Sequence, residues 1–208
     1  MPILHRRDLD ALGQRQIRTL SSVWLMDELG PVTWPPAPIR TERLVLRASE
    51  ARDRAAVIEL FASPEVGRFI GGVQPRADLE RTVPAEVPGS RAGFFVVELN
   101  GVMMGTITLD RRDAERRGHV APNSRAPWLG YLFLPEAWGR GYAAEAGAVV
   151  LDWFAGELPG ESVVLCTQTA NEPSMRVAMK LGFTEVERFE EWDAEQWFGV
   201  WSSPTPSG

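Results

Sequence analysis

The sequence of 208 residues has few of the side chains that build disulfide frameworks and metal centres. It holds one cysteine, Cys166, and two histidines, His5 and His119, which are far apart along the chain. One cysteine cannot form an intramolecular disulfide, and two distant histidines do not supply the three or four ligands of a zinc site. The sequence therefore predicts no metal, and its cysteine content is typical of a reducing compartment.

Long apolar runs and an excess of positive charge are also missing. No stretch approaches the roughly 20 apolar residues that span a bilayer, and the first residues, MPILHRRDLD, carry charges where a signal peptide needs an apolar segment. The 28 acidic and 22 basic residues give a net charge of −6, which argues against a nucleic-acid-binding protein. We therefore expect a cytoplasmic protein that contacts neither membrane nor nucleic acid.

Proline and hydrophobic patterns divide the chain into three parts. Residues 1–38 form an extension, in which apolar positions at helical spacing precede a proline-rich, extended connector over 31–38. Residues 39–201 form one domain, and the 44% hydrophobic content of the chain is sufficient for a core. Residues 202–208 are a polar tail. The role of the extension is left open.

Turn and cap signals set the order of elements in the domain. Asn100-Gly101 between two apolar runs predicts a hairpin, because both residues tolerate a positive φ. Asn171 and Pro173 favour the start of a helix that ends at Gly182. The expected order is a strand, two helices, three strands, a helix, a strand, a helix and two strands, which indicates a mixed α/β domain. Residues 73–91 are left unassigned.

The segment from Pro127 to Ala146 is the most informative part of the chain. An apolar strand ends at Pro135, and the turn Trp138-Gly-Arg-Gly-Tyr-Ala opens directly into an alanine-rich helix. The first N–H groups of a helix lack partners within it, so such a turn binds anions. Two glycines, Gly139 and Gly141, let a phosphate approach the backbone. The alternative is a tight turn between strand and helix without a ligand.

Four motifs in order resemble the GNAT superfamily of acyl-CoA-dependent N-acetyltransferases, and its ribosomal-protein-alanine acetyltransferase branch most closely. They are TERLVLR at Thr41–Arg47, the turn at Trp138–Ala146, Asn171 with Ser174, and KLGF at Lys180–Phe183. The resemblance covers residues 39–201. It implies a mixed, largely antiparallel twisted sheet of about six to seven strands flanked by about four helices, with acetyl-CoA as co-substrate.

The resemblance also implies which residues hold acetyl-CoA. The pantetheine arm would add to the strand edge at Gly130–Leu134, where an N–H near Phe133 or Leu134 would bond the thioester oxygen. The glycine turn would hold the pyrophosphate, although the family usually has Gln or Arg at the position of Trp138. The residues implied are Leu132, Phe133, Leu134, Trp138, Gly139, Arg140, Gly141, Tyr142, Ala143, Asn171 and Ser174. Asn171 and Ser174 also suit simple helix capping.

The resemblance implies a less complete set of residues for proton transfer. Many relatives place an acidic tyrosine where this chain has Ala178, so Ser174 is the candidate acid. They also place a carboxylate where this chain has Trp128. The candidate bases are Glu98 and Asp110, with Glu190 and Glu191 as further carboxylates that could act through water.

The sequence thus predicts an acetyl-CoA-dependent N-acetyltransferase in which an amine attacks the thioester directly in a ternary complex. The acceptor is a protein N-terminus or a small-molecule amine, with Trp128 and Trp192 near it. An alternative is a GNAT-fold sensor or interaction module that binds acyl-CoA without turnover. A homodimer is compatible with the sequence, and the oligomeric state is left open.

Overall fold

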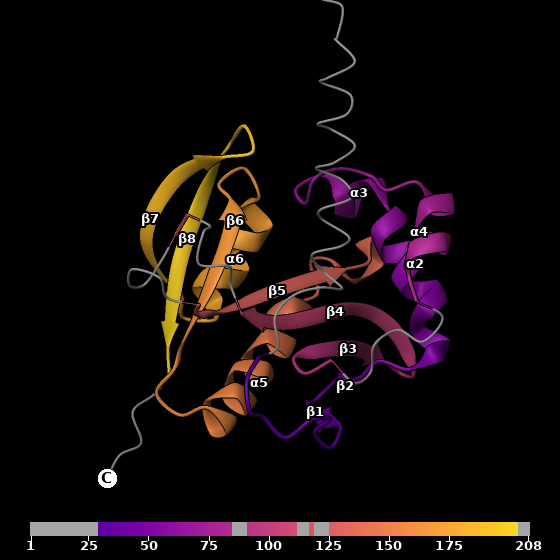
Figure 1. Cartoon of the computed structure of the whole chain (residues 1–208), viewed down its shortest axis with the longest axis horizontal. Helices are drawn as coiled ribbons and strands as arrows, with labels where there is room; N and C mark the ends of the chain where they lie inside the picture. Colours follow the sequence, from indigo (N-terminus) through magenta and orange to yellow (C-terminus); the bar gives the residue numbers. More distant parts are fainter. Residues whose placement is uncertain (1–28, 85–90, 112–116, 119–124, 204–208) are drawn as a thin grey trace, which may run out of the picture.

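A computed structural model describes residues 29–84, 91–111, 117–118 and 125–203. Eight strands form one sheet in the order β1-β2-β3-β4-β5-β6-β8-β7, and all neighbours are antiparallel except β5 and β6 (Figure 1). The strands are β1 (Ile39–Arg40), β2 (Val45–Ala48), β3 (Phe94–Leu99), β4 (Val102–Arg111), β5 (Pro127–Phe133), β6 (Ser162–Gln168), β7 (Thr184–Glu191) and β8 (Ala194–Ser202). The helices are α2 (Arg54–Ala62), α3 (Pro64–Gly67), α4 (Arg76–Thr82), α5 (Tyr142–Glu157) and α6 (Glu172–Lys180), with single 3₁₀ turns at Ala51–Asp53 and Pro135–Ala137.

This architecture confirms the mixed, largely antiparallel α/β fold expected from the sequence. The hairpin is present, with φ of 53° at Asn100 and 81° at Gly101. Asn171 caps α6 by accepting a hydrogen bond from the backbone N of Ser174, and Gly182 follows the helix with φ of 86°. These features are set by neighbouring residues, which is why the sequence predicts them.

The two faces of the sheet carry separate cores, because successive strand side chains point to opposite faces. Phe95 and Val97 of β3 belong to the core under α5 and α6, which also contains Ala146, Val150 and Ala178. Their neighbours Phe94 and Val96 belong to the core under α2, α3 and α4. Each face of the sheet is therefore covered by its own helices, as Figure 1 shows.

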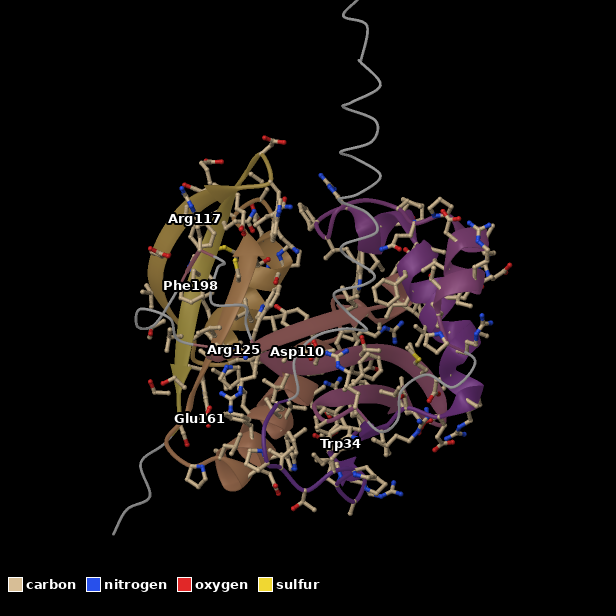
Figure 2. All side chains as sticks on the ribbon, viewed as in Figure 1. Trp34, Asp110, Arg117, Arg125, Glu161 and Phe198 are labelled. Atoms are coloured by element: carbon tan, nitrogen blue, oxygen red, sulfur yellow. The ribbon has the colours of Figure 1, made fainter. Side chains whose placement is uncertain are left out.

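The proline-rich segment at 29–38 is packed rather than a free connector. Leu29 is fully buried, and Trp34 (labelled in Figure 2) makes edge-to-face contacts with Phe95 at 5.0 Å and Trp153 at 6.0 Å. Arg111 donates from Nε to the carbonyl of Leu29 at 2.8 Å. The segment therefore braces the α5 face of the sheet.

Other expectations need correction or lie outside the described residues. The strand expected to begin at Ile39 is divided into β1 and β2, because the Thr41 hydroxyl accepts from the Leu44 backbone at 2.8 Å and forms a turn between them. The helix α4 was not predicted from residues 73–91. Arg111 is the last residue of β4 and forms an ion pair with Glu161. The helix expected within residues 1–28 lies outside the described part of the chain.

Candidate functional site

The two parallel strands of the sheet pair at one position only. Within the described residues, β5 and β6 are matched at Trp128 and Val164, whereas β4 matches β5 from Gly105–Phe133 to Arg111–Pro127. Beyond this position β5 runs toward α2 and α4 while β6 stays beside β8 (Figure 1). Residues 130–133 of β5 thus form an edge that no strand in the described part of the chain covers, which we call the unpaired edge of β5.

Backbone alternation shows which groups this edge offers. The N–H of Leu134 donates to the carbonyl of Met104 at 2.9 Å, so Leu134 bonds toward β4. Since successive residues of a strand point their N–H and C=O groups to opposite sides, Tyr131 and Phe133 point theirs away from β4. Of the two donors predicted for the thioester oxygen, Phe133 therefore faces the edge, and Leu134 is already used. The indole N–H of Trp138 donates to the Phe133 carbonyl at 2.7 Å.

The edge leads into the glycine turn and the start of α5. Gly139 and Gly141 have φ of 72° and 80°, the left-handed region that glycine adopts without strain. The first bond within the helix runs from the Glu145 N–H to the Gly141 carbonyl at 3.0 Å. The N–H groups of Tyr142, Ala143 and Ala144 precede this bond, so they are available to an anion at the positive end of α5.

An ion-paired cluster from the TERLVLR motif holds this turn in place. Arg43 donates to the Glu145 carboxylate at 2.7 Å and to the Arg140 carbonyl at 3.0 Å, and its guanidinium lies 4.6 Å from the centre of the Tyr142 ring. Burial raises the pKa of Glu145, but hydrogen bonds from Thr41 and Arg43 outweigh it, so the pKa is lowered. Glu145 is therefore a charged group that anchors the turn.

A groove of about 360 Å³ borders the turn and is lined by α5 and by the C-terminal end of α6. Its lining includes Gly141, the cations Arg43 and Lys180, and the carboxylates Glu145 and Asp152. The groove extends from the N-terminus of α5 to the C-terminus of α6 and ends at Trp201.

The first turn of α6 approaches β5 from the other direction. Ser174 lies in this turn, and its backbone N donates to the Asn171 side chain at 3.3 Å, so the capping interpretation of Asn171 is correct. The phenol oxygen of Tyr131 lies 2.7 Å from the Ser174 hydroxyl. Tyr131 was missed in the sequence, because no local signal indicates that a side chain of β5 reaches α6. Ala178, where relatives carry tyrosine, is fully buried in the core.

Glu98, one of the two candidate bases, is engaged in a buried ion-pair cluster. Its carboxylate accepts from Arg47 at 2.6 Å and from Arg52 at 3.3 Å. Arg47 also bonds both oxygens of Asp53, at 2.7 and 2.8 Å. Glu98 lies on β3, which β4 separates from β5. These contacts are those of a residue that links β2, β3 and the start of α2.

Asp110, the other candidate base, lies directly beside the single contact between β5 and β6. It is opposite Trp128 in the β4–β5 register, and residues directly opposite in an antiparallel pair share one face. Asp110 is 3% exposed and forms an ion pair with Arg91 (Figure 2 labels Asp110). The chain therefore places a carboxylate next to Trp128, on the neighbouring strand.

The two tryptophans expected near an acceptor are not neighbours along the sheet. Trp128 is at the level of Val164 on β6, whereas Trp192 lies in the turn between β7 and β8, beyond the pair Gln168–Gln196. Trp192 has φ of 55° and is 53% exposed.

The described residues hold neither a membrane-spanning helix nor a group of metal ligands. None of the helices there is long and apolar enough to cross a membrane. In the same part of the chain, no three side chains of histidine, cysteine, aspartate or glutamate are grouped as a bound metal ion would require.

Comparisons with known proteins agree with this geometry. The family model described as the acetyltransferase (GNAT) domain matches residues 43–184. The chain is 29% identical over 154 residues to YoaA of Bacillus subtilis, named an uncharacterized N-acetyltransferase, and the match covers 70% of this chain and 81% of YoaA.

Solved structures share the fold. A GNAT-family acetyltransferase from Bacillus anthracis matches with a TM-score of 0.66 and 24% identity, over 80% of this chain and 99% of that one. The spermidine N-acetyltransferase of Vibrio cholerae, in complex with CoA and spermine, matches with a TM-score of 0.61 and 17% identity, over 78% and 97%. The ribosomal-protein-alanine branch is not distinguished by these matches. With the family model spanning most of its domain, this chain belongs to the GNAT family of acetyltransferases.

Proposed function

We propose that this chain transfers the acetyl group of acetyl-CoA to a primary amine, by direct attack of the amine on the thioester in a ternary complex. The observation that carries the proposal is the continuity of the unpaired edge of β5 with the glycine turn and the N-terminus of α5. The amides of the pantetheine arm can pair with the unpaired edge of β5, and the pyrophosphate can bind the glycine turn and the N-terminus of α5. The adjoining groove offers Arg43 and Lys180 to the nucleotide half.

The chain would hold acetyl-CoA through backbone groups more than through side chains. Phe133 would direct its N–H at the thioester oxygen, where charge develops as the amine attacks. The N–H groups of Tyr142 and Ala143 would bond the pyrophosphate, with Gly139 and Gly141 leaving it room. For the N–H of Phe133 to meet the pantetheine, no movement of β5 is needed, since no strand among the described residues pairs with that edge.

Proton transfer would use Asp110 and Ser174. An amine is mostly protonated at neutral pH and must lose a proton before it attacks. Asp110 is favoured over Glu98 because it lies beside Trp128, on the strand next to β5, whereas Glu98 already accepts from two guanidinium groups, those of Arg47 and Arg52. Asp110 forms an ion pair with Arg91 and would accept the proton through a water. Ser174 would assist the departing sulfur as a hydrogen-bond donor.

The acceptor is proposed to be a cationic amine. A net charge of −6 favours such a molecule, and the Vibrio cholerae neighbour holds spermine. Polyamines, aminoglycosides, amino acids and peptides with free N-termini together form a suitable panel.

The test is release of free thiol from acetyl-CoA, measured with a chromogenic disulfide across this panel. The wild-type protein should release thiol only when an acceptor is present, and Gly141→Glu should abolish release because a carboxylate would occupy the pyrophosphate position. The second candidate function, a module that binds acyl-CoA without turnover, is motivated by Trp128 and Ala178, where relatives carry proton-transfer groups. Tight calorimetric binding of acetyl-CoA without release by any acceptor would favour that module.

A further inference from the structure

Tyr131 joins β5 to α6 through its side chain. Its phenol oxygen lies 2.7 Å from the hydroxyl and 3.1 Å from the carbonyl oxygen of Ser174. The side chain is on the same face as Leu129 and Phe133, under α5 and α6, while its backbone groups point to the unpaired edge of β5. One residue thus contributes to the edge with its backbone and reaches Ser174 with its side chain.

The phenol has a single proton and two acceptors on the same partner. When it donates to the Ser174 carbonyl, the 2.7 Å contact requires the Ser174 hydroxyl to donate to the phenol. When it donates to the Ser174 hydroxyl, the proton of that hydroxyl is released for a third group. The two arrangements differ only by rotation of two O–H bonds, because both acceptors already lie within hydrogen-bond distance.

The phenol itself is a poor acid in this position. Burial raises the pKa of Tyr131 and the hydrogen bond with Ser174 lowers it only in part, so the pKa is about 12. A thiol has a pKa well below this, about 8.5 for free cysteine. Transfer of the phenol proton to the leaving thiolate is therefore unfavourable. Tyr131 can keep its proton and act as a hydrogen-bond donor throughout the reaction.

We propose that Tyr131 is a positioning residue, whose phenol donates to the Ser174 hydroxyl and so directs the Ser174 proton at the sulfur that leaves. This inference rests on the proposed function, because the sulfur reaches Ser174 only if the pantetheine follows the edge of β5. In the step, the C–N bond forms and the C–S bond breaks with its electron pair moving to sulfur. The amine loses one proton through Asp110 and a second to water. The thiolate, stabilised by the Ser174 hydrogen bond, then takes a proton from water.

The inference is tested by comparing the binding of CoA and desulfo-CoA by calorimetry from pH 7 to pH 10. The two ligands differ only at the sulfur, so the ratio of their affinities isolates the contacts of the thiol and thiolate. In the wild-type protein, CoA should gain about tenfold over desulfo-CoA as the thiol ionises, the effect of one hydrogen bond to a charged group. In Tyr131→Phe and in Ser174→Ala this gain should be lost.

Turnover gives a second measurement. Tyr131→Phe should lower kcat about tenfold with KM for acetyl-CoA unchanged, because the ring and the backbone edge remain. In the Ser174→Ala background, Tyr131→Phe should have no further effect, since the partner through which it acts is gone. Thr184→Val is the matched control: it removes a hydroxyl that donates to a backbone carbonyl, Val200, at 3.2 Å, at the start of β7. It should leave both measurements unchanged.

Each alternative has its own signature. If Tyr131 only ties α6 to β5, Tyr131→Phe will weaken CoA and desulfo-CoA equally and will lower kcat in the Ser174→Ala background as well, which would overturn the inference. If the wild-type protein fails to bind either ligand, the proposed function itself is wrong and the inference falls with it. If the wild-type protein is active and Tyr131→Phe matches it, the inference alone is refuted.

Discussion

Gly141→Ala separates the proposed anion-binding role of the glycine turn from its structural role. Gly141 has φ of 80°, and a Cβ built there would lie 3.7 Å from the nearest atom, the Arg43 Nη2, so the methyl group fits. The cost is the left-handed backbone, about 1–2 kcal/mol for a residue with a side chain. For a chain of this length, that lowers the melting temperature by roughly 2–8 °C.

Gly160→Ala supplies the matched control. Gly160 has φ of 82°, a Cβ there would meet nothing within 4 Å, and it lies after the other end of α5. Its substitution should therefore reduce the free energy of unfolding by the same amount. Only Gly141→Ala should weaken CoA, by about ten- to a hundredfold, because the methyl group displaces a phosphate from one charge-assisted hydrogen bond.

The assay combines thermal unfolding with calorimetric titration of CoA for the two variants. Equal losses of stability with unequal losses of affinity would support the turn as the pyrophosphate site. If Gly141→Ala and Gly160→Ala weaken CoA to the same small extent, the turn does not bind the cofactor and serves only to connect β5 with α5.

The remaining predictions concern the carboxylates and the packed N-terminal segment. Asp110→Asn should lower kcat at least tenfold with little change in KM for acetyl-CoA. Glu98→Gln should keep kcat and lose about 1–3 kcal/mol of stability, because it weakens the bonds of this side chain to Arg47. The opposite pattern in enzyme kinetics and urea unfolding would exchange the roles of the two residues. Trp34→Ala should cost about 3 kcal/mol, because it removes the edge-to-face contacts with Phe95 and Trp153, and a melting temperature within 2 °C of wild type would contradict this estimate. Burial raises the pKa of Asp53, but the hydrogen bonds that its carboxylate accepts from Arg47 lower the pKa by more than this, so the net shift is downward. Its folded-state pKa is thus below the unfolded value of about 3.9, and its contribution to stability is present above that value and lost as the pH falls through the folded pKa. Between pH 5 and pH 2, Asp53→Asn should therefore lose less stability than the wild-type protein in urea unfolding, and parallel losses would refute the assignment.

The packing of residues 29–38 bears on the role of the N-terminal extension. Leu29 is fully buried and the backbone N of Thr33 donates to Glu157 of α5 at 2.8 Å. This part of the extension is therefore continuous with the α5 core, and truncation after residue 38 would remove core residues. A deletion meant to test the function of the extension should stop before Leu29.

Local signals in the sequence were sufficient for most of the elements and for the glycine turn of the candidate site. The Asn100-Gly101 turn, the Asn171 cap and the Gly182 stop depend on neighbours within a few residues, so they can be read from the chain directly. The glycine turn before α5 is of the same kind. By contrast, α4 is short and charged, and its single fully buried residue, Leu79, gives too weak a periodic signal to predict it.

The sequence alone determined the family resemblance, the glycine turn before α5, and the order of elements apart from α4 and the division of β1 from β2, because each of these depends on residues close together in the chain. Only the tertiary structure decided how residues distant in the sequence are combined. It joined Tyr131 to Ser174, placed Asp110 beside Trp128 and engaged Glu98 with Arg47. Such contacts depend on strand register and on the divergence of β5 from β6, which follow from the packing of the whole sheet between its two helical layers.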